Sequence, residues 1–323
     1  MSLTAEAIAD RRRLKRRVTK WRVIAILAVV IAFAGVGFMA LSADGVSGFS
    51  DHIARVRVDG MITGKRKKIE LLKKLAKTDR VKAVLITIDS PGGTTAGSEA
   101  LYEEIRKLAA KKPVVSVLES TATSGGYITA IAGDYIVARG NTVTGSIGVI
   151  FQWPQFKELL EKLGVKMREL KSDPLKASPN PFEEPSPEAL AVMESLIKDS
   201  HDWFLKLVSE RRKLGEAETR TLGDGRVYTG RQALTAKLID EVGGEDAALA
   251  WLKTNKKISS DLKVVDWAPS VAENLSLPGV LARKIGRILG ISFVEGVFEA
   301  TEKTLTPERL KLDGLISVWQ PRN

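Results

Sequence analysis

The stretch Val114–Ala132, VVSVLESTATSGGYITAIA, decides the fold expected for this chain. Val114–Leu118 is a short apolar run that predicts a buried strand, and Tyr127–Ala132 predicts a helix. Between them lies Ser124, followed by two glycines. A serine at a strand-to-helix junction lies beside backbone N–H groups that have no partner within the helix. Ser124 is therefore the candidate nucleophile, and we expect it to be exposed at the start of the helix.

The segments on either side repeat this order of strand, glycine turn and helix. Val81–Ile88 predicts a strand, Asp89–Gly93 (DSPGG) a turn, and Ser98–Ala109 a helix with one apolar face. Alternating strands and helices are typical of an α/β fold with a largely parallel sheet. Further along, the pattern predicts a helix over Pro154–Leu163 and a strand over Val165–Leu170.

A serine nucleophile needs a base, and histidine is scarce in this chain. Its two histidines, His52 and His201, stand in no motif. The candidate base is Lys176, in Pro174–Pro179 (PLKASP), with Lys171 as its rival. A free lysine has a pKa of about 10.4 and is protonated at neutral pH. Burial would have to lower that pKa before the amine accepts a proton.

Glycine turns after predicted strands supply candidate hydrogen-bond donors. Three such turns are present, Ser90–Gly93, Ser124–Gly126 and Thr144–Gly148. The N–H groups of Gly93 and Gly125 are the candidate oxyanion-hole donors. No Walker lysine pattern or dinucleotide fingerprint accompanies these turns, so nucleotide binding is poorly supported. No His, Asp or Glu cluster has metal-ligand spacing, and we expect neither metal nor cofactor.

The amino-terminal residues predict a membrane anchor. The chain has 323 residues, no cysteine and a net charge of +11, of which residues 1–22 carry +6 (eight Arg/Lys against Glu6 and Asp10). The 21 residues 23–43 contain no charge, which is long enough for a helix to span the hydrocarbon core. A cleaved signal peptide and a buried core helix are the alternatives. Positive flanking charge predicts a cytoplasmic amino terminus, with the rest of the chain outside the inner membrane. The basic segment thus orients the anchor, and we expect no nucleic-acid partner.

Taken in order, three segments resemble the signal peptide peptidase SppA family of membrane-anchored serine peptidases. They are DSPGG over Asp89–Gly93, STATSGGY over Ser120–Tyr127 and TVTGSIGV over Thr142–Val149. Later segments, Gly225–Arg231 and Leu238–Gly243, are also similar to that family, and the resemblance covers roughly Ile53 to Leu252.

The resemblance implies a ClpP/crotonase-like α/β superhelix and a short, single-repeat member. It implies Ser124 as nucleophile, Lys176 as general base and Ser146 as the residue that supports the lysine. Short members assemble into homo-oligomeric rings, in which the lysine can reach the serine of a neighbouring subunit. The implied substrates are remnant signal peptides, whose apolar cores suit an apolar groove beside inner-membrane lipid.

The expected organisation follows from these features. A cytoplasmic basic tail (1–22) precedes the anchor (23–43) and a linker (44–52). A serine peptidase domain (53–255) is followed by an extension (256–323) for oligomerisation or membrane-proximal packing. Two alternatives have other functions: a catalytically silent oligomeric membrane scaffold on the same fold, and a crotonase-type acyl-CoA enzyme. Export disfavours the second, because coenzyme A is not met outside the cytoplasm.

Overall fold

The computed structural model describes residues 17–28, 50–259, 261–269 and 316–318. The chain divides into two compact units, residues 1–50 with 277–292, and residues 51–276 with 293–323. In the first unit, residues 17–28 are helical and expose their apolar side chains. Among the described residues, no helix has both the length and the apolar character needed to cross a bilayer. Most of the expected anchor, residues 29–43, lies outside the described residues.

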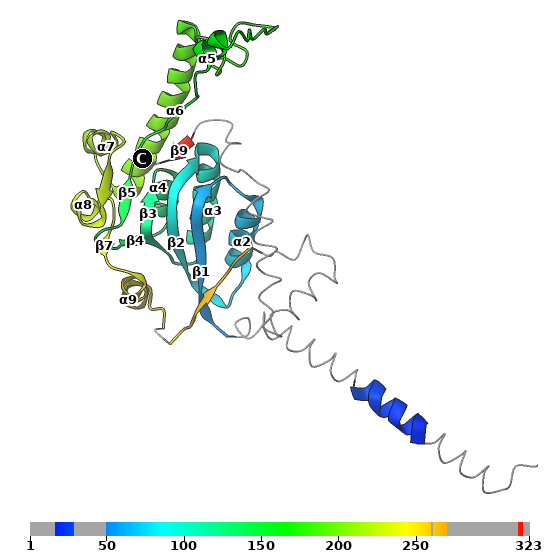
Figure 1. The fold of residues 1–323 in the computed structure, drawn as a ribbon. Coiled ribbons are helices and arrows are strands. Elements are labelled where there is room, and N and C mark those ends of the chain that lie inside the picture. Colours follow the sequence, from blue (N-terminus) through cyan, green and yellow to red (C-terminus); the bar gives the residue numbers. More distant parts are fainter. Residues whose placement is uncertain (1–16, 29–49, 260, 270–315, 319–323) are drawn as a thin grey trace, which may run out of the picture. The chain divides into compact units, whose positions relative to one another are not determined.

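The second unit is built on one mixed sheet (Figure 1). Its described strands run in the order β6-β5-β3-β2-β1-β8, with β4 beside β3, β7 beside β4 and β9 beside β2. All pairs are parallel except β5 with β6 and β2 with β9. The strands are β1 (His52–Ile62), β2 (Val81–Thr94), β3 (Val114–Thr123), β4 (Tyr135–Ala138), β5 (Val143–Gly145), β6 (Val227–Thr229), β7 (Glu241–Val242), β8 (Val264–Asp266) and β9 (Ile316–Val318).

Helices cover both faces of this sheet. Alternate residues of a strand point to opposite faces, so Val84 and Ile86 join the core beneath α2, α3 and α4, whereas Leu85 packs with α9. The helices are α2 (Arg66–Lys77), α3 (Thr95–Ala109), α4 (Gly125–Ala130), α5 (Lys157–Lys162), α6 (Pro187–Arg212), α7 (Glu216–Leu222), α8 (Gly230–Thr235) and α9 (Glu245–Lys256). The expected α/β fold with a largely parallel sheet is confirmed.

The long helix α6 leaves the body of the unit. Ser186 caps it, accepting a hydrogen bond from the Ala189 N–H at 3.2 Å, and Pro187 is its first residue. Its later part is buried against the core through Phe204, Leu205, Leu207 and Val208, whereas most of its first part is exposed or only half-buried. Figure 1 shows α5 at the end of α6 away from the sheet. We call residues 150–196 the arm.

Two sequence predictions fall within the arm. The helix expected over Pro154–Leu163 is present but shorter, Lys157–Lys162, whereas the strand expected over residues 165–170 is wrong, since those residues form no strand. Val165, Met167 and Leu170, which produced the apolar pattern, are exposed rather than paired in the sheet. An alternating apolar pattern predicts a buried face, but it does not identify the segment that covers that face. No described part of this chain covers the apolar side chains of residues 165–170.

Candidate active site

Ser124 occupies a strained turn between β3 and α4. Its backbone has φ 55° and ψ −117°, a region that a residue with a side chain rarely adopts. Such a conformation costs on the order of 1–3 kcal/mol and persists where the surroundings enforce it, often at active sites. Here the Ser124 N–H donates to the Gly145 oxygen at 2.8 Å, and its carbonyl accepts from the Ile128 N–H at 2.9 Å. These two bonds hold the turn at both ends.

The Ser124 side chain does not serve as an ordinary helix cap. No capping hydrogen bond runs from it to α4. The residue is also 1% exposed, so the expectation of an exposed serine is wrong. The Ser124 turn is buried because Gly145 on β5 and Ser90 on β2 lie on either side of it.

Gly126 and Gly93 lie too close to the backbone of a neighbouring strand to carry a side chain. A Cβ added at Gly126 would lie 2.7 Å from the Ser90 oxygen, so the start of α4 rests directly on β2. A Cβ at Gly93 would lie 1.8 Å from the Ile62 oxygen on β1. Glycine is thus required sterically at both places. The candidate donor Gly93 follows Ser90 on the same strand, and Gly125 is the first residue of α4.

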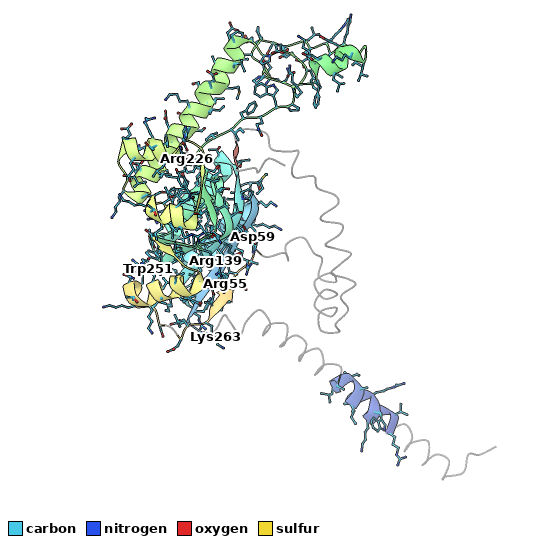
Figure 2. The ribbon with its side chains drawn as sticks, turned by 60° about the vertical axis from the view of Figure 1, so that its left-hand side comes forward. Arg55, Asp59, Arg139, Arg226, Trp251 and Lys263 are labelled. Carbon is cyan, nitrogen blue, oxygen red and sulfur yellow. The ribbon has the colours of Figure 1, made fainter. Side chains whose placement is uncertain are left out.

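Ser146 lies next to Ser124 through the sheet. Thr123 at the end of β3 pairs with Gly145 at the end of β5, so the serines that follow them leave adjacent parallel strands at the same level. Ser146 is 8% exposed with φ 50°, and its N–H donates to the Arg226 oxygen at 2.8 Å. Figure 2 labels Arg226 near the base of the arm, and Arg55 lies toward the other end of the sheet. The two predicted serines are therefore brought together at the arm end of the unit.

Lys176 belongs to the arm. Its side chain is exposed, and its backbone N–H donates to the Asp173 oxygen at 3.0 Å in a local turn. The flanking chain is tied back to the arm, since the Phe156 N–H donates to the Pro181 oxygen at 2.7 Å. Among the described residues, neither a hydrogen bond nor an ion pair is seen between Lys176 and the turn of Ser124, so their pairing stays a prediction.

The rival lysine is engaged elsewhere. Lys171 pairs with Glu183 at 2.5 Å and with Glu169 at 3.0 Å, and all three line a cavity of about 360 Å³ in the arm. The hydrogen bonds to Glu183 and then Glu169 raise the pKa of Lys171 above its ordinary value. A raised pKa keeps the amine protonated, which is the opposite of what a general base needs.

Lys68, in the first turn of α2, is half-buried. Lys68 lines a cavity of about 120 Å³ at the end of β1, together with Asp59 and Ile62. Burial lowers the pKa of Lys68, with Asp59 opposing the shift. The helical spacing from Lys68 to the buried Leu72 and Leu75 was the signal for this inward position.

Both histidines have structural partners. His52 is buried, and its ring stacks on Trp267, whose Nε1–H donates to His52 Nε2 at 3.1 Å. His201 lies on α6, and its Nε2 is 2.9 Å from the Gly223 oxygen. Neither reaches the Ser124 turn through a described contact, so a serine–histidine arrangement is not supported.

Comparison with known proteins identifies relatives of this chain. Residues 106–259 match Peptidase family S49. A Synechocystis sp. protein whose name marks it as a candidate protease is 36% identical over 66% of this chain and 78% of its own. A protein of Methanocaldococcus jannaschii, named in the same way, is 34% identical over 72% of this chain and 76% of its own.

A third relative carries the family name expected from the motifs. The chloroplastic serine protease SPPA of Arabidopsis thaliana is 30% identical over 84% of this chain and 42% of its own. The matched region contains the Ser124 turn, the Ser146 turn and the arm. The predicted resemblance is confirmed, and the chain belongs to Peptidase family S49, the serine peptidases that include signal peptide peptidase SppA.

Proposed function

We propose that the protein is a membrane-anchored serine endopeptidase that degrades cleaved signal peptides with a Ser124–Lys176 dyad. The observation that carries the proposal is the conformation of Ser124, a non-glycine residue held at φ 55° between two neighbouring strand ends. A strained serine at a strand-to-helix turn is the arrangement by which α/β hydrolases present a nucleophile. A silent scaffold would have no use for the strain, which glycine at the same position would relieve.

In the proposed mechanism, the Ser124 oxygen attacks the scissile carbonyl while Lys176 takes its proton. Lys176 then gives that proton to the leaving amine, and water releases the acyl group by the reverse sequence. The Gly93 and Gly125 N–H groups stabilise the oxyanion, and Ser146 positions the lysine amine. Ser146 is suited to that task because it leaves β5 beside Ser124.

We infer that the lysine comes from a neighbouring copy in a homo-oligomeric ring. Lys176 is exposed on the arm, whereas Ser124 is buried in the sheet edge of the body. The arm also exposes many large apolar side chains, which is typical of a surface covered by another chain. They include Phe156, Leu159, Leu163, Val165, Met167, Leu170, Leu175, Phe182, Leu190, Val192 and Leu196. A head-to-tail ring would place each arm over the Ser124 turn of the next subunit. Such a ring would be a ClpP-like assembly.

The proposed setting is the inner membrane, with the amino terminus cytoplasmic and the catalytic unit on the outer side. It rests on the basic residues 1–22 and the uncharged residues 23–43. A reporter fused after Ser50 that is active only outside the cytoplasm tests this orientation. Substrates released from the membrane would be extended and apolar, so a signal-peptide core should be cleaved faster than a polar peptide of equal length.

Complementation tests the shared dyad. Ser124→Ala and Lys176→Ala should each be inactive, and a fluorophosphonate should label only forms in which both dyad residues are intact. Co-expression of the two variants in equal amounts should restore about a quarter of the activity, since one interface in four then joins an intact serine to an intact lysine. Lys171→Ala, which leaves both dyad residues intact, is the matched lysine control. If co-assembled rings recover no activity, the dyad lies within one chain. Full activity of Ser124→Ala would exclude Ser124 as the nucleophile.

A further inference from the structure

The amino ends of the parallel strands lie together at the end of the sheet opposite the Ser124 turn. Ile53, near the start of β1, pairs with Ala83 near the start of β2 and with Val264 at the start of β8. The helices α2 and α3 end a few residues before β2 and β3, so their carboxyl ends lie there too. The later part of α9 joins them, because Trp251 stacks on Tyr135, the first residue of β4. We call residues 51, 73–82, 111–112 and 253–263 the basic edge.

The basic edge carries more positive charge than the rest of the chain beyond the amino-terminal tail. It holds eleven Lys or Arg residues against three Asp residues, a net charge of +8. Residues 23–323 as a whole carry only +5, which is the +11 of the chain less the +6 of residues 1–22. The other residues of that stretch therefore have a net negative charge. The positive charge is concentrated on one edge of the sheet and is not spread over the surface.

Most of these cations are not neutralised within the described part of the chain. Lys82 pairs with Asp51 at 3.2 Å, and Lys112 Nζ donates to the Thr78 oxygen. Six other lysines are exposed and make no ion pair with a described residue: Lys73, Lys77, Lys111, Lys253, Lys257 and Lys263. Figure 2 shows Lys263 at the end of the unit away from Arg226 and the arm. Clustered like charges repel one another, so this edge is suited to an anionic partner.

Two half-buried tryptophans lie among the lysines. Lys74 Nζ is 5.6 Å from the ring centroid of Trp267, and Lys256 Nζ is 5.5 Å from that of Trp251. An indole ring has an apolar body and a polar N–H, and such rings are enriched at the headgroup level of membranes. Lysines beside tryptophans therefore match the chemistry of a bilayer surface better than that of bulk water.

The sequence also brings this edge close to the membrane. Only eight residues, 44–51, separate the predicted anchor from β1. Fully extended, eight residues reach at most about 30 Å. An anionic headgroup surface attracts Lys and Arg side chains within a Debye length, about 8 Å at physiological ionic strength. RNA or an acidic protein would also fit the charge, but the chain itself brings neither of them to this edge.

We propose that the basic edge docks on the anionic phospholipid headgroups of the bilayer in which the chain is anchored. The proposal rests on the proposed anchor and goes beyond it, because an anchor alone does not orient the catalytic unit. Docking would hold the Ser124 turn about 30 Å from the headgroups, since the ten residues of β3 lie between them at about 3.3 Å each. Substrates must then leave the bilayer before they reach the serine.

Proximity to lipid tests the docking on the full chain. The chain contains no cysteine, so one fluorophore can be attached through Thr254→Cys on the basic edge, or through Thr63→Cys just beyond the other end of β1. The Ser124→Ala chain carries the label in nanodiscs with nitroxide-labelled headgroups. With phosphatidylglycerol present, the label at position 254 should be quenched and the label at position 63 should not. Quenching should be lost in phosphatidylcholine alone and at about 1 M salt, where the Debye length is about 3 Å.

Charge reversal identifies the surface. Lys111→Glu with Lys263→Glu should lower the ratio of docked to undocked chain on the order of 30-fold or more, since each lysine near an anionic surface contributes about five-fold. Arg66→Glu with Lys67→Glu makes the same change in net charge at the start of α2, near the other end of β1, and should leave docking unchanged.

The outcomes separate docking from the anchor and from peptidase activity. Equal loss of quenching in both charge-reversed pairs, equal quenching in neutral and anionic discs, or no quenching in any disc would overturn docking. Co-elution of the chain with the discs measures insertion of the anchor by itself. A chain that inserts without quenching therefore contradicts docking alone, and a chain that does not insert contradicts both. The Ser124→Ala background makes each result independent of peptide hydrolysis.

Discussion

Ser124 and Ser146 leave two neighbouring parallel strands at the same level, and both have a positive φ, 55° and 50°. The link between them is direct, because the Ser124 N–H donates to the oxygen of Gly145, the residue before Ser146. Two strained serines held side by side are unusual for a purely structural sheet edge. In the proposed mechanism, this adjacency would let one lysine amine contact both hydroxyl groups.

The strain at Ser124 predicts opposite effects of glycine on stability and activity. Ser124→Gly should abolish peptide hydrolysis and raise the free energy of unfolding by about 1 kcal/mol, since glycine adopts φ 55° without a Cβ clash. Ser124→Ala keeps the Cβ and should abolish activity without that gain. Chemical denaturation and peptide hydrolysis measure the two effects. Equal stability of the Gly and Ala variants would show that the turn is not strained.

The close approach of Gly93 to β1 predicts a strong steric effect. Gly93→Ala would bring a Cβ to 1.8 Å from the Ile62 oxygen, so β1 or β2 must shift, and we expect a loss of more than about 2 kcal/mol in stability. Gly215→Ala is the matched control, because a Cβ there meets nothing within 4 Å and should cost at most about 1 kcal/mol. Thermal unfolding of the two variants compares them, and similar melting temperatures would contradict the packing described.

The apolar arm predicts a charge-sensitive assembly. In the proposed ring, Leu170→Glu and Met167→Glu should separate the subunits into monomers and reduce peptidase activity on the order of 100-fold or more, because each arm would no longer reach its neighbour. Leu234→Glu, at an exposed apolar residue of α8 outside the arm, should leave assembly and activity intact. Light scattering after size-exclusion chromatography measures the mass. A monomeric, fully active wild-type chain would exclude the shared dyad.

Tyr127 predicts a loss of stability at alkaline pH. Its buried hydroxyl donates to the Leu238 oxygen at 2.8 Å, and burial raises the pKa of Tyr127 well above its ordinary value. Because the folded pKa is the higher one, this contribution is complete below the ordinary value of about 10 and is lost as the pH rises toward the folded pKa.

Tyr127→Phe checks that origin. The variant should lose about 1 kcal/mol at neutral pH, when the Leu238 oxygen loses its donor, and should show a smaller decline between pH 9 and 11. Denaturation midpoints across that range give the comparison. Tyr135, whose pKa is raised to about 12 by burial and by its hydrogen bond to Glu241, stays in both proteins as the common background. Parallel declines in both proteins would remove Tyr127 as the cause.

The sequence by itself determined the layered α/β fold, the strand and helix that frame Ser124, and the family. Those features are local: apolar runs such as Val81–Ile88 and the glycine turns specify their own conformation within a few residues. Ser124 was visible from its place between a predicted strand and a predicted helix, and Ser146 from the resemblance of Thr142–Val149 to the family.

Only the tertiary structure decided which contacts form at a distance. The Ser124 turn is bonded to Gly145, Lys68 is half-buried at the end of β1, and the strand Ile316–Val318 pairs with the distant Gly92–Thr94. Residues 165–170 were wrongly predicted to form a strand for the same reason. Their apolar pattern carries no information about which distant segment would pair with them or cover them. Local sequence specifies conformation over a few residues, whereas the pairing of distant backbone edges is decided by the packing of the whole sheet.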